Sequence, residues 1–295
     1  AYILFYYLLT LTASAQHEAD NWYFGYGGGI SFKTGTPIAI RSGKLDSFEG
    51  CATISDKKTG DLLFYTNGAT IWNRNHQVMK NGTGLLGGES SSQGVLIVPD
   101  PGNSQQYYVF TAPDLSPIGP IISTKLHYSV VSLQDLAGEV ILKNYPLVDG
   151  VAEKVTGTLD CSGTGFWVIT HSAYANQFYA FHLTSQGINL KPVISSHLSA
   201  PEDYRGGYMK ISPDRCKLAL SAISKLELFD FDANTGQIKS IITFNDVGAY
   251  GISFSPDNTK LYATNYNLTP KTIVQYEINL PNTNDIRKSL VILDT

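Results

Sequence analysis

The feature that most constrains this chain is an internal repeat with a period close to 49 residues. Gly138, Gly187 and Gly236 follow one another at intervals of 49 residues, and Asn284 comes 48 residues later. Each lies between segments rich in aromatic and β-branched side chains, which favour strands, and Gly and Asn tolerate the positive φ of a tight hairpin. A four-stranded propeller blade repeats every ~40–50 residues. The spacing therefore predicts an all-β β-propeller with WD40-like blades.

A second repeated element is a strand that ends in a turn containing Asp, followed by an aromatic and β-branched strand. The Asp side chain of such a turn can accept hydrogen bonds from backbone N–H groups two residues on. The turn residues are Asp56, Asp100, Asp160, Asp214 and Asp257. If the strand before each Asp is the innermost one, the chain contains five complete four-stranded blades and almost no helix. Their predicted ranges are 48–87, 92–147, 151–198, 205–246 and 248–294.

Residues 21–41 are predicted to form an incomplete N-terminal blade. Residues 21–38 align without a gap on residues 61–78, so the segment supplies strands two to four and lacks the innermost strand. In a closed ring that strand comes from the far C-terminus and leaves no free edge. The sequence reaches Thr295 at the close of a fourth strand. We therefore expect a ring that is truncated at its C-terminus.

Residues 1–15 stand apart from the repeat. Residues 2–11 are an apolar run, and Ala13-Ser14-Ala15 follows as a small–x–small cleavage pattern, which is how a secretory signal peptide ends. The run is too short to span a bilayer comfortably. A signal peptide at 1–15 and a propeller at 16–295 are predicted, on a secreted or cell-surface protein, with the periplasm as the alternative location. A buried first strand is the other interpretation of the run.

The composition limits the classes of partner that can be expected. The chain has 21 Lys and Arg against 25 Asp and Glu, a formal net charge of −4, and its basic residues are scattered. Because a phosphate-binding surface has clustered Lys and Arg, no nucleic-acid partner is expected. No segment after the signal peptide is expected to span a membrane. The three cysteines, Cys51, Cys161 and Cys216, are too few for a disulfide framework. They are small buried or turn residues, or Cys161 and Cys216 form one bridge.

No sequence motif predicts catalysis, a metal or a cofactor. The segment 230–236 resembles a calcium loop, but its Gly stands at position seven and Ile241 occupies the position that needs a bidentate Glu. An ordinary hairpin is the favoured interpretation. The six histidines show no HxH or HExxH spacing, and neither a Gly-x-Ser-x-Gly elbow nor a phosphate loop occurs.

A ligand site is predicted where the chain enters each innermost strand, because these positions ring the mouth of a propeller's central channel. Counting back from each turn Asp reaches polar or aromatic residues in four of the five blades. Solvated strand starts are the alternative explanation of this pattern. The loop 112–123 lies on the same face, contains three prolines and is expected to contact a partner or the face itself. The predicted mouth residues are Glu49, Gln93, Glu153, Arg205, Tyr208 and Tyr250.

Several segments together resemble a known family. They are Asn21–Gly25, Phe48–Asp56, Leu62–Thr66, Ile71–Asn73, His76–Met79, Asn81–Leu85 and the two Ser-Pro-Asp turns. The pattern is similar to the N-terminal propeller region of gliding-motility-associated, type IX-secreted surface proteins of Bacteroidota, which carry a type B sorting domain. The resemblance covers nearly all of residues 21–295. It implies a seven-bladed ring, further C-terminal domains in the same polypeptide, and no catalytic residues to carry over.

We therefore expect a non-catalytic extracellular binding or scaffold module, related to adhesion or gliding, whose partner is a protein or a glycan at the cell surface. A propeller-fold carbohydrate-active enzyme, either a glycosidase or a lyase, is one alternative. A glycosidase needs two carboxylates about 5–9.5 Å apart, and Glu49 and Glu153 are the acidic residues at the mouth. A propeller accessory to a periplasmic transport machine is the other.

Overall fold

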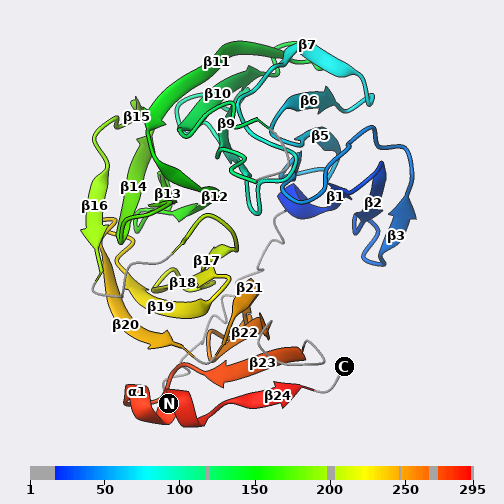
Figure 1. The fold of residues 1–295 in the computed structure, drawn as a ribbon. Helices are drawn as coiled ribbons and strands as arrows, with labels where there is room; N and C mark the ends of the chain where they lie inside the picture. The colour runs from blue at the N-terminus through cyan, green and yellow to red at the C-terminus, as the bar shows by residue number, and fades with distance from the viewer. Residues whose placement is uncertain (1–16, 117–119, 198–202, 246, 266–271, 294–295) are drawn as a thin grey trace, which may run out of the picture.

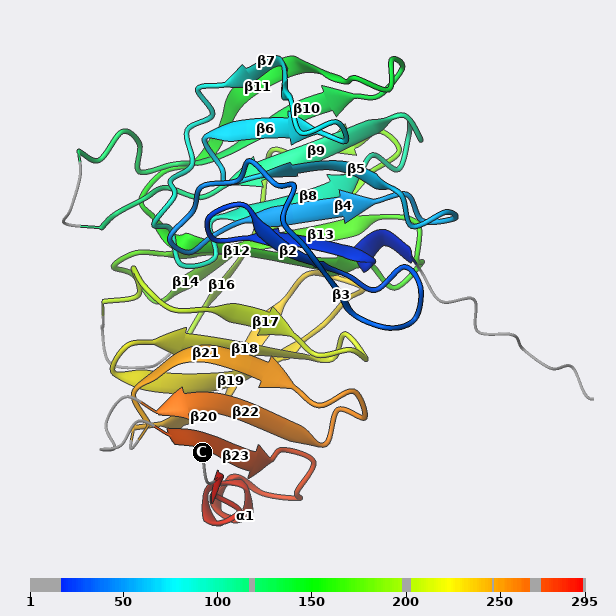
Figure 2. The same ribbon diagram turned by 90° about the vertical axis from the view of Figure 1, so that its right-hand side faces the viewer.

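The computed structural model describes residues 17–116, 120–197, 203–245, 247–265 and 272–293. The signal peptide predicted at 1–15 lies outside the described residues. The chain forms antiparallel sheets that stand side by side around an arc (Figure 1) and stack face to face (Figure 2). The predicted β-propeller fold is confirmed.

After a short 3-10 helix, η1 (His17–Ala19), the strands form an N-terminal sheet and five units that we call blades 1 to 5. The N-terminal sheet contains β1 (Asn21–Phe24), β2 (Gly28–Ser31) and β3 (Ile38–Ile40). Blade 1 contains β4 (Ala52–Ser55), β5 (Leu62–Thr66), β6 (Thr70–Asn73) and β7 (Val78–Thr83). Blade 2 contains β8 (Val95–Pro99), β9 (Gln106–Thr111), β10 (Leu126–Ser132) and β11 (Glu139–Val148).

The remaining blades follow in chain order. Blade 3 contains β12 (Val151–Leu159), β13 (Phe166–Ser172), β14 (Gln177–Thr184), β15 (Gly187–Ile188) and β16 (Val193–Ser196). Blade 4 contains β17 (Met209–Ile211), β18 (Lys217–Ala222), β19 (Lys225–Phe231) and β20 (Ile238–Phe244). Blade 5 contains β21 (Ala249–Phe254), β22 (Lys260–Asn265), β23 (Thr272–Glu277) and β24 (Val291–Leu293).

The strands lie within the predicted blade ranges, except that β11 ends at Val148, one residue later. Two details go beyond the repeat. Blades 1 and 2 join at their outer edges, where β7 and β11 pair in parallel at Lys80 and Glu139 and form one eight-stranded sheet. In blade 3 the hairpin at Gly187 adds the short strand β15, and β14 pairs with both β15 and β16.

The connection predicted as a hairpin at Asn284 is instead a short helix, α1 (Thr283–Lys288), between β23 and β24. The Asn282 side chain caps this helix by accepting a hydrogen bond from the Asp285 N–H at 3.0 Å. Asp285 lies in the first turn and Lys288 in the last, which suits the helix dipole. Ile286 is buried against blades 4 and 5. Local capping and one apolar contact therefore replace the tight turn of the other blades.

Four of the five turns that contain Asp are built as their sequences predict, while in the fifth the Asp160 carboxylate accepts the Ser162 hydroxyl at 2.6 Å. The Asp100 carboxylate accepts the Gly102 N–H at 2.8 Å, and the Asp214 carboxylate accepts the Cys216 N–H at 3.0 Å. The segment 230–236 is confirmed as a hairpin between β19 and β20, where the Asp232 carboxylate accepts the Asn234 N–H at 2.9 Å. Within the described ranges, no cluster of three or more His, Cys, Asp or Glu is suited to hold a metal ion.

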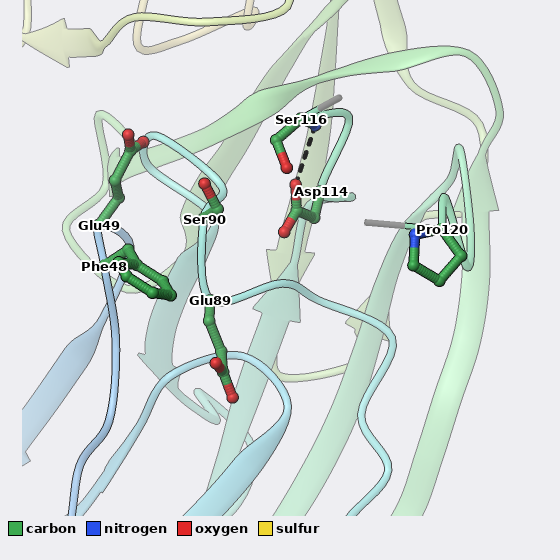
Figure 3. Close-up of a pocket in the computed structure, with 7 residues that line it drawn as sticks. All are labelled: Phe48, Glu49, Glu89, Ser90, Asp114, Ser116 and Pro120. Atoms are coloured by element: carbon green, nitrogen blue, oxygen red, sulfur yellow. Dashed lines mark hydrogen bonds between the residues drawn. The ribbon is translucent and has the colours of Figure 1, made fainter. Parts of the chain in front are cut away.

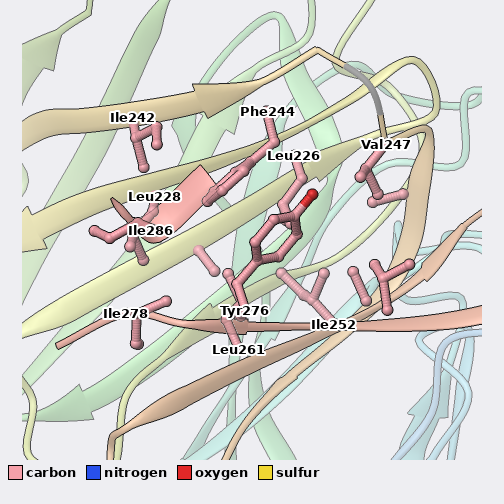
Figure 4. Packing of buried hydrophobic residues seen from close by; sticks show 14 of the residues in the cluster. Leu226, Leu228, Ile242, Phe244, Val247, Ile252, Leu261, Tyr276, Ile278 and Ile286 are labelled. Atoms are coloured by element: carbon pink, nitrogen blue, oxygen red, sulfur yellow. The ribbon is translucent and has the colours of Figure 1, made fainter. Parts of the chain in front are cut away.

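The hydrophobic core is divided into five clusters, four between neighbouring blades and one between the N-terminal sheet and blade 1. We call the interface between blades 3 and 4 the 3–4 seam, and that between blades 4 and 5 the 4–5 seam. In the 4–5 seam, Leu228 of β19, Phe244 of β20 and Tyr276 of β23 pack together (Figure 4), with the rings of Phe244 and Tyr276 4.2 Å apart. Side chains alternate between the two faces of a strand, so each inner blade buries both faces.

The N-terminal sheet differs from its prediction at the edge of β1. The missing innermost strand would leave backbone groups of residues 21–25 without strand partners. In the structure, the Tyr23 N–H donates to Thr53 Oγ1 at 3.0 Å and the Ser47 N–H donates to the Gly25 carbonyl at 3.2 Å. The Tyr23 ring also stacks on Tyr65 at 4.6 Å. Blade 1 and the connection before it therefore provide hydrogen-bond partners for part of the β1 backbone.

The cysteines are free: Cys161 and Cys216 are exposed, Cys51 is half-buried, and the alternative of a Cys161–Cys216 bridge is not realised. Burial raises the pKa of the Cys51 thiol. Across the described part of the chain, no helix has the length and apolar character that a membrane crossing requires.

Candidate functional site

The predicted mouth residues converge, although they come from blades far apart in the sequence. The Tyr250 hydroxyl, at the start of β21, lies 2.6 Å from Glu49 Oε2 and 2.9 Å from Ser92 Oγ. Glu49 precedes β4, and Ser92 precedes β8. One hydroxyl therefore links blade 5 to the entrances of blades 1 and 2. Burial, followed by the hydrogen bond to Glu49, raises the pKa of Tyr250.

Glu153 is held inside this network rather than at its surface, because only 6% of it is exposed. Its Oε1 accepts the Leu115 N–H at 2.8 Å, and its Oε2 accepts the Ser92 hydroxyl at 3.1 Å. Burial raises the pKa of Glu153, and these hydrogen bonds oppose that rise. The carboxylate thus joins blade 3 to two loops of blade 2.

Gln93 also connects blades. Its side-chain oxygen accepts the Met209 N–H of blade 4 at 2.8 Å, while its side-chain nitrogen donates to the Val155 carbonyl of blade 3 at 3.2 Å. The backbones of Gln93 and Lys154 form a parallel bridge between the starts of β8 and β12. Gln93 and Glu153 therefore hold the inner ends of three blades together.

Arg205 and Tyr208 lie at the margin of this network. Arg205 makes a forked ion pair with Asp203, with Nε–Oδ1 and Nη2–Oδ2 distances of 2.9 and 2.6 Å, and this pair raises the pKa of Arg205. Its guanidinium also lies 5.9 Å from the centre of the Tyr174 ring. Tyr208 meets Tyr250 edge to face at 5.8 Å.

Two residues of the mouth network were missed from the sequence. Ser92 stands one position before a predicted residue, and its hydroxyl also accepts the Gly207 N–H at 3.2 Å. Lys154 is fully buried, and its Nζ donates to the carbonyls of Gly206 at 2.6 Å and Ser221 at 2.9 Å. Burial lowers the pKa of Lys154 to about 7. The sequence signal that could have identified this residue is a lysine within an inner strand, β12.

A pocket of about 470 Å³ opens beside this network, between blades 1 and 2 (Figure 3). Three connections supply its lining: the entrance to β4, the β7–β8 connection and the β9–β10 loop. The residues that line it are Phe48, Glu49, Glu89, Ser90, Asp114, Ser116 and Pro120. Glu49 is a predicted site residue, and the last three come from the predicted contact loop 112–123.

Among the described residues, the pocket lining carries three carboxylates, those of Glu49, Glu89 and Asp114, and no Lys or Arg. Burial raises the pKa of Glu89, and the neighbouring carboxylates of Asp46 and Asp114 raise it further. The Glu89 carboxylate accepts one side-chain hydrogen bond, from the Asn67 amide at 3.3 Å. The pocket is therefore a site of concentrated negative charge.

An exposed aromatic pair stands beside the pocket, and one of its members, Phe48, lines it. Phe48 is 72% exposed, Tyr26 is 71% exposed, and their rings meet edge to face at 5.9 Å. Exposed aromatic faces beside carboxylates can attract an organic cation through the ring quadrupole as well as through charge. Neither ring was singled out from the sequence, because Tyr26 and Phe48 approach each other only through the pairing of Tyr26 with Asp46.

Comparison with known proteins identifies the fold. No protein-family model matches the chain, and no curated protein matches its sequence. Among solved structures, the periplasmic gluconolactonase PpgL of Pseudomonas aeruginosa is similar over 90% of this chain and 76% of that one, with a TM-score of 0.55 and 15% identity. A candidate 6-phosphogluconolactonase from Bacteroides uniformis is similar over the same shares, with a TM-score of 0.52 and 17% identity. At these identities the likeness shows the β-propeller fold alone.

Proposed function

We propose that this propeller is a non-catalytic binding module of a secreted or cell-surface protein, and that its acidic pocket binds a basic side chain of a partner protein. The observation that carries the proposal is the presence of Glu49, Glu89 and Asp114 together with Phe48 in the lining of one pocket, among whose described lining residues there is no Lys or Arg. The resemblance to type IX-secreted, gliding-motility-associated proteins of Bacteroidota supports the extracellular location and a role in adhesion.

The charge of the pocket favours a cation over a neutral glycan. The Asp46 and Asp114 carboxylates disfavour the charged form of Glu89, and a bound ammonium or guanidinium group would relieve that repulsion while forming charge-assisted hydrogen bonds. A sugar hydroxyl donates hydrogen bonds but leaves the net charge unchanged. The exposed ring of Phe48, which lines the pocket, adds a cation–π attraction of about 0.5–1 kcal/mol at such a site.

The mouth network supports a scaffold role rather than a reaction. Glu153, the deepest carboxylate at the mouth, accepts hydrogen bonds from both Leu115 and Ser92, and Gln93 bonds to two blades. These groups hold the rims of the blades in place around the pocket, which keeps its carboxylates positioned before a ligand arrives.

Binding of a short fluorescent peptide with a central lysine, measured by anisotropy, tests the proposal. The same peptide with that lysine acetylated is the matched probe and is expected to bind at least ~10-fold more weakly, because a hydrogen bond to a charged group contributes about 1.5–3 kcal/mol. The double variant Glu89→Gln and Asp114→Asn keeps the side-chain shapes and is expected to lose binding to a similar extent.

Glu277→Gln on blade 5 is the control, because it removes an acidic side chain distant from the pocket lining, and it should leave binding unchanged. Equal binding of both peptides, or binding of the wild-type protein to a neutral oligosaccharide that the double variant retains, would overturn the proposed ligand. Hydrolysis of gluconolactone by the wild-type protein, abolished by the double variant, would instead establish an enzyme.

A further inference from the structure

The 3–4 seam contains a cluster of ionisable side chains that the proposed function does not use. His171 is the penultimate residue of β13 and His197 follows β16, both in blade 3, whereas Glu227 lies on β19 of blade 4. Each of the three is at most 6% exposed. Tyr204 and Lys225 complete the cluster, with the Lys225 ammonium 4.9 Å from the centre of the Tyr204 ring. Such groups are rarely buried together, because each charged form is costly away from water.

The hydrogen bonds determine where the protons of the two imidazoles lie. His171 Nδ1 is 2.6 Å from the Ser172 carbonyl, which can only accept, so Nδ1 carries a proton. In neutral His171, Nε2 is then an acceptor. It lies 2.9 Å from His197 Nε2, so His197 must donate from that nitrogen. Both rings belong to blade 3, and His197 in turn meets blade 4, where its ring centre lies 5.3 Å from that of Phe229. The hydrogen bond that holds His197 in this position survives only while at most one of the two rings is charged.

A first proton can enter the cluster without breaking this contact. The remaining nitrogen of His197, Nδ1, lies 3.9 Å from Glu227 Oε1, and a proton there would face a carboxylate. Lys225 opposes it, because its ammonium is 3.9 Å from the other Glu227 oxygen. Burial lowers the pKa of His197, the Glu227 carboxylate partly restores it, and Lys225 lowers it again.

A second proton cannot be accommodated. It would have to bind His171 Nε2, which would set two N–H groups against each other across 2.9 Å and place two imidazolium charges side by side in a buried seam. Burial and then His197 hold the pKa of His171 well below its usual range, and Lys154 and Lys225 add positive charge nearby. The described residues that contact or face the pair are Lys154, Ser172, Phe178, Tyr204, Lys225, Glu227 and Phe229.

We propose that the His171–His197 hydrogen bond, which holds His197 against Phe229 and Glu227 of blade 4, is an acid-sensitive latch, and that charging both rings loosens the 3–4 seam while the 4–5 seam stays closed. When the seam is open, His171 takes up a proton as pH falls below the ordinary histidine pKa of 6.5. In the closed seam the pKa of His171 is held well below that value, so the ring stays neutral. The stability that the latch contributes is thus fully present above pH 6.5 and is lost as pH falls. For one proton, the equilibrium constant for opening rises by up to about tenfold per pH unit. Arg205 follows Tyr204 in the chain, and its carbonyl accepts the Glu153 N–H. Opening of the seam would therefore also displace part of the mouth network.

Nitrogen-15 NMR of histidine-labelled wild-type protein tests the first step. At pH 7.5, His171 should be the Nδ1–H tautomer and His197 should carry a proton on Nε2. His171 should remain neutral at pH 5.5, where an exposed histidine is mostly charged. A His171 that is protonated on Nε2 at neutral pH, or that titrates near 6.5 with the seam intact, would overturn the latch.

Amide exchange at pH 7.5 and 5.0, corrected for the intrinsic rate, tests the opening. We expect residues 171–184 and 225–231 to exchange at least ~10-fold faster at pH 5.0 and residues 249–265 of the apolar seam to change less than ~2-fold. His171→Phe should remove the difference between the two pH values. His127→Phe, which replaces a buried histidine of blade 2, should keep it. Equal loosening of both seams, or of neither, would contradict the proposal.

Discussion

The two seams of blade 4 are built from the same strand and yet have opposite chemistry. Along β19, Leu226 and Leu228 point into the 4–5 seam, whereas Glu227 and Phe229 point into the 3–4 seam. The 4–5 cluster is made of aliphatic and aromatic side chains (Figure 4), while the 3–4 seam combines an apolar cluster with buried His, Lys and Glu. Because side chains alternate along the strand, blade 4 has one face whose stability depends on how well apolar side chains fill the interface. The stability of its other face also depends on pH.

The largest effect is expected from Phe244→Ala in the 4–5 seam. Phe244 is 2% exposed and packs against Tyr276, so the substitution should lower the free energy of unfolding by about 3–5 kcal/mol. Urea unfolding at pH 7.5 and 5.5 should give the same loss, because no ionisable pair is changed. A loss that differs between the two pH values by more than about 1 kcal/mol would break the proposed division between the seams.

Glu227→Gln in the 3–4 seam is expected to cost about 3 kcal/mol, because it removes the carboxylate that faces both His197 and Lys225 and leaves their charge buried. Unlike the Phe244 substitution, the cost should grow as pH falls and His197 takes up a proton. Urea unfolding across pH 5.5–7.5 measures this slope. A cost that is constant over the range would show that His197 does not use Glu227.

Lys154 offers a third test, at the inner end of the 3–4 seam. Its folded pKa of about 7 lies below the ordinary value of 10.5, so the unfolded chain holds a proton that the folded chain releases. Stability should therefore rise with pH above 7, by about 2 kcal/mol between pH 7 and 9. Lys154→Met should abolish this rise in urea unfolding. An unchanged rise in the variant would assign it to another group.

The smallest effect is expected at the mouth, where Tyr250 bonds to Glu49 and Ser92 in partly exposed surroundings. Tyr250→Phe keeps the ring against Tyr208 and removes only the hydroxyl, which should cost about 1 kcal/mol. The loss should appear as faster amide exchange in β21 but not in β13. Equal acceleration in both strands would mean that the mouth network, rather than the seams, sets the opening of the blades.

The repeat could be recognised in the sequence because it depends on interactions between residues close together in the chain. Turn residues such as Asp100 and Gly236 form the same hydrogen bonds and backbone conformations wherever they recur, so their spacing predicts the strands. The helix at 283–288 escaped that reading because its cap, Asn282, looks like another turn residue. Its stability comes from Ile286 docking on a neighbouring blade, which no local pattern records.

The site could be predicted only in part. Glu49 was found from its place before an innermost strand, and the loop that carries Asp114 was marked by its prolines. Glu89 was missed because the β7–β8 connection has no pattern of its own. Its importance arises from two neighbouring carboxylates, Asp46 and Asp114, that lie 43 and 25 positions away in the chain but share its surroundings.

The sequence by itself determined the blades of this propeller, their order and the two faces of each strand, because turn chemistry and the alternation of side chains act over a few residues. Only the tertiary structure decided which polar residues hold blades together and which line a pocket. Glu49 and Tyr250 are 201 residues apart and meet because the arc of blades brings their strand starts to a common centre. The electrostatics of buried groups such as His171 and Lys154 depend on distance in space and on the exclusion of water, and both are set by packing.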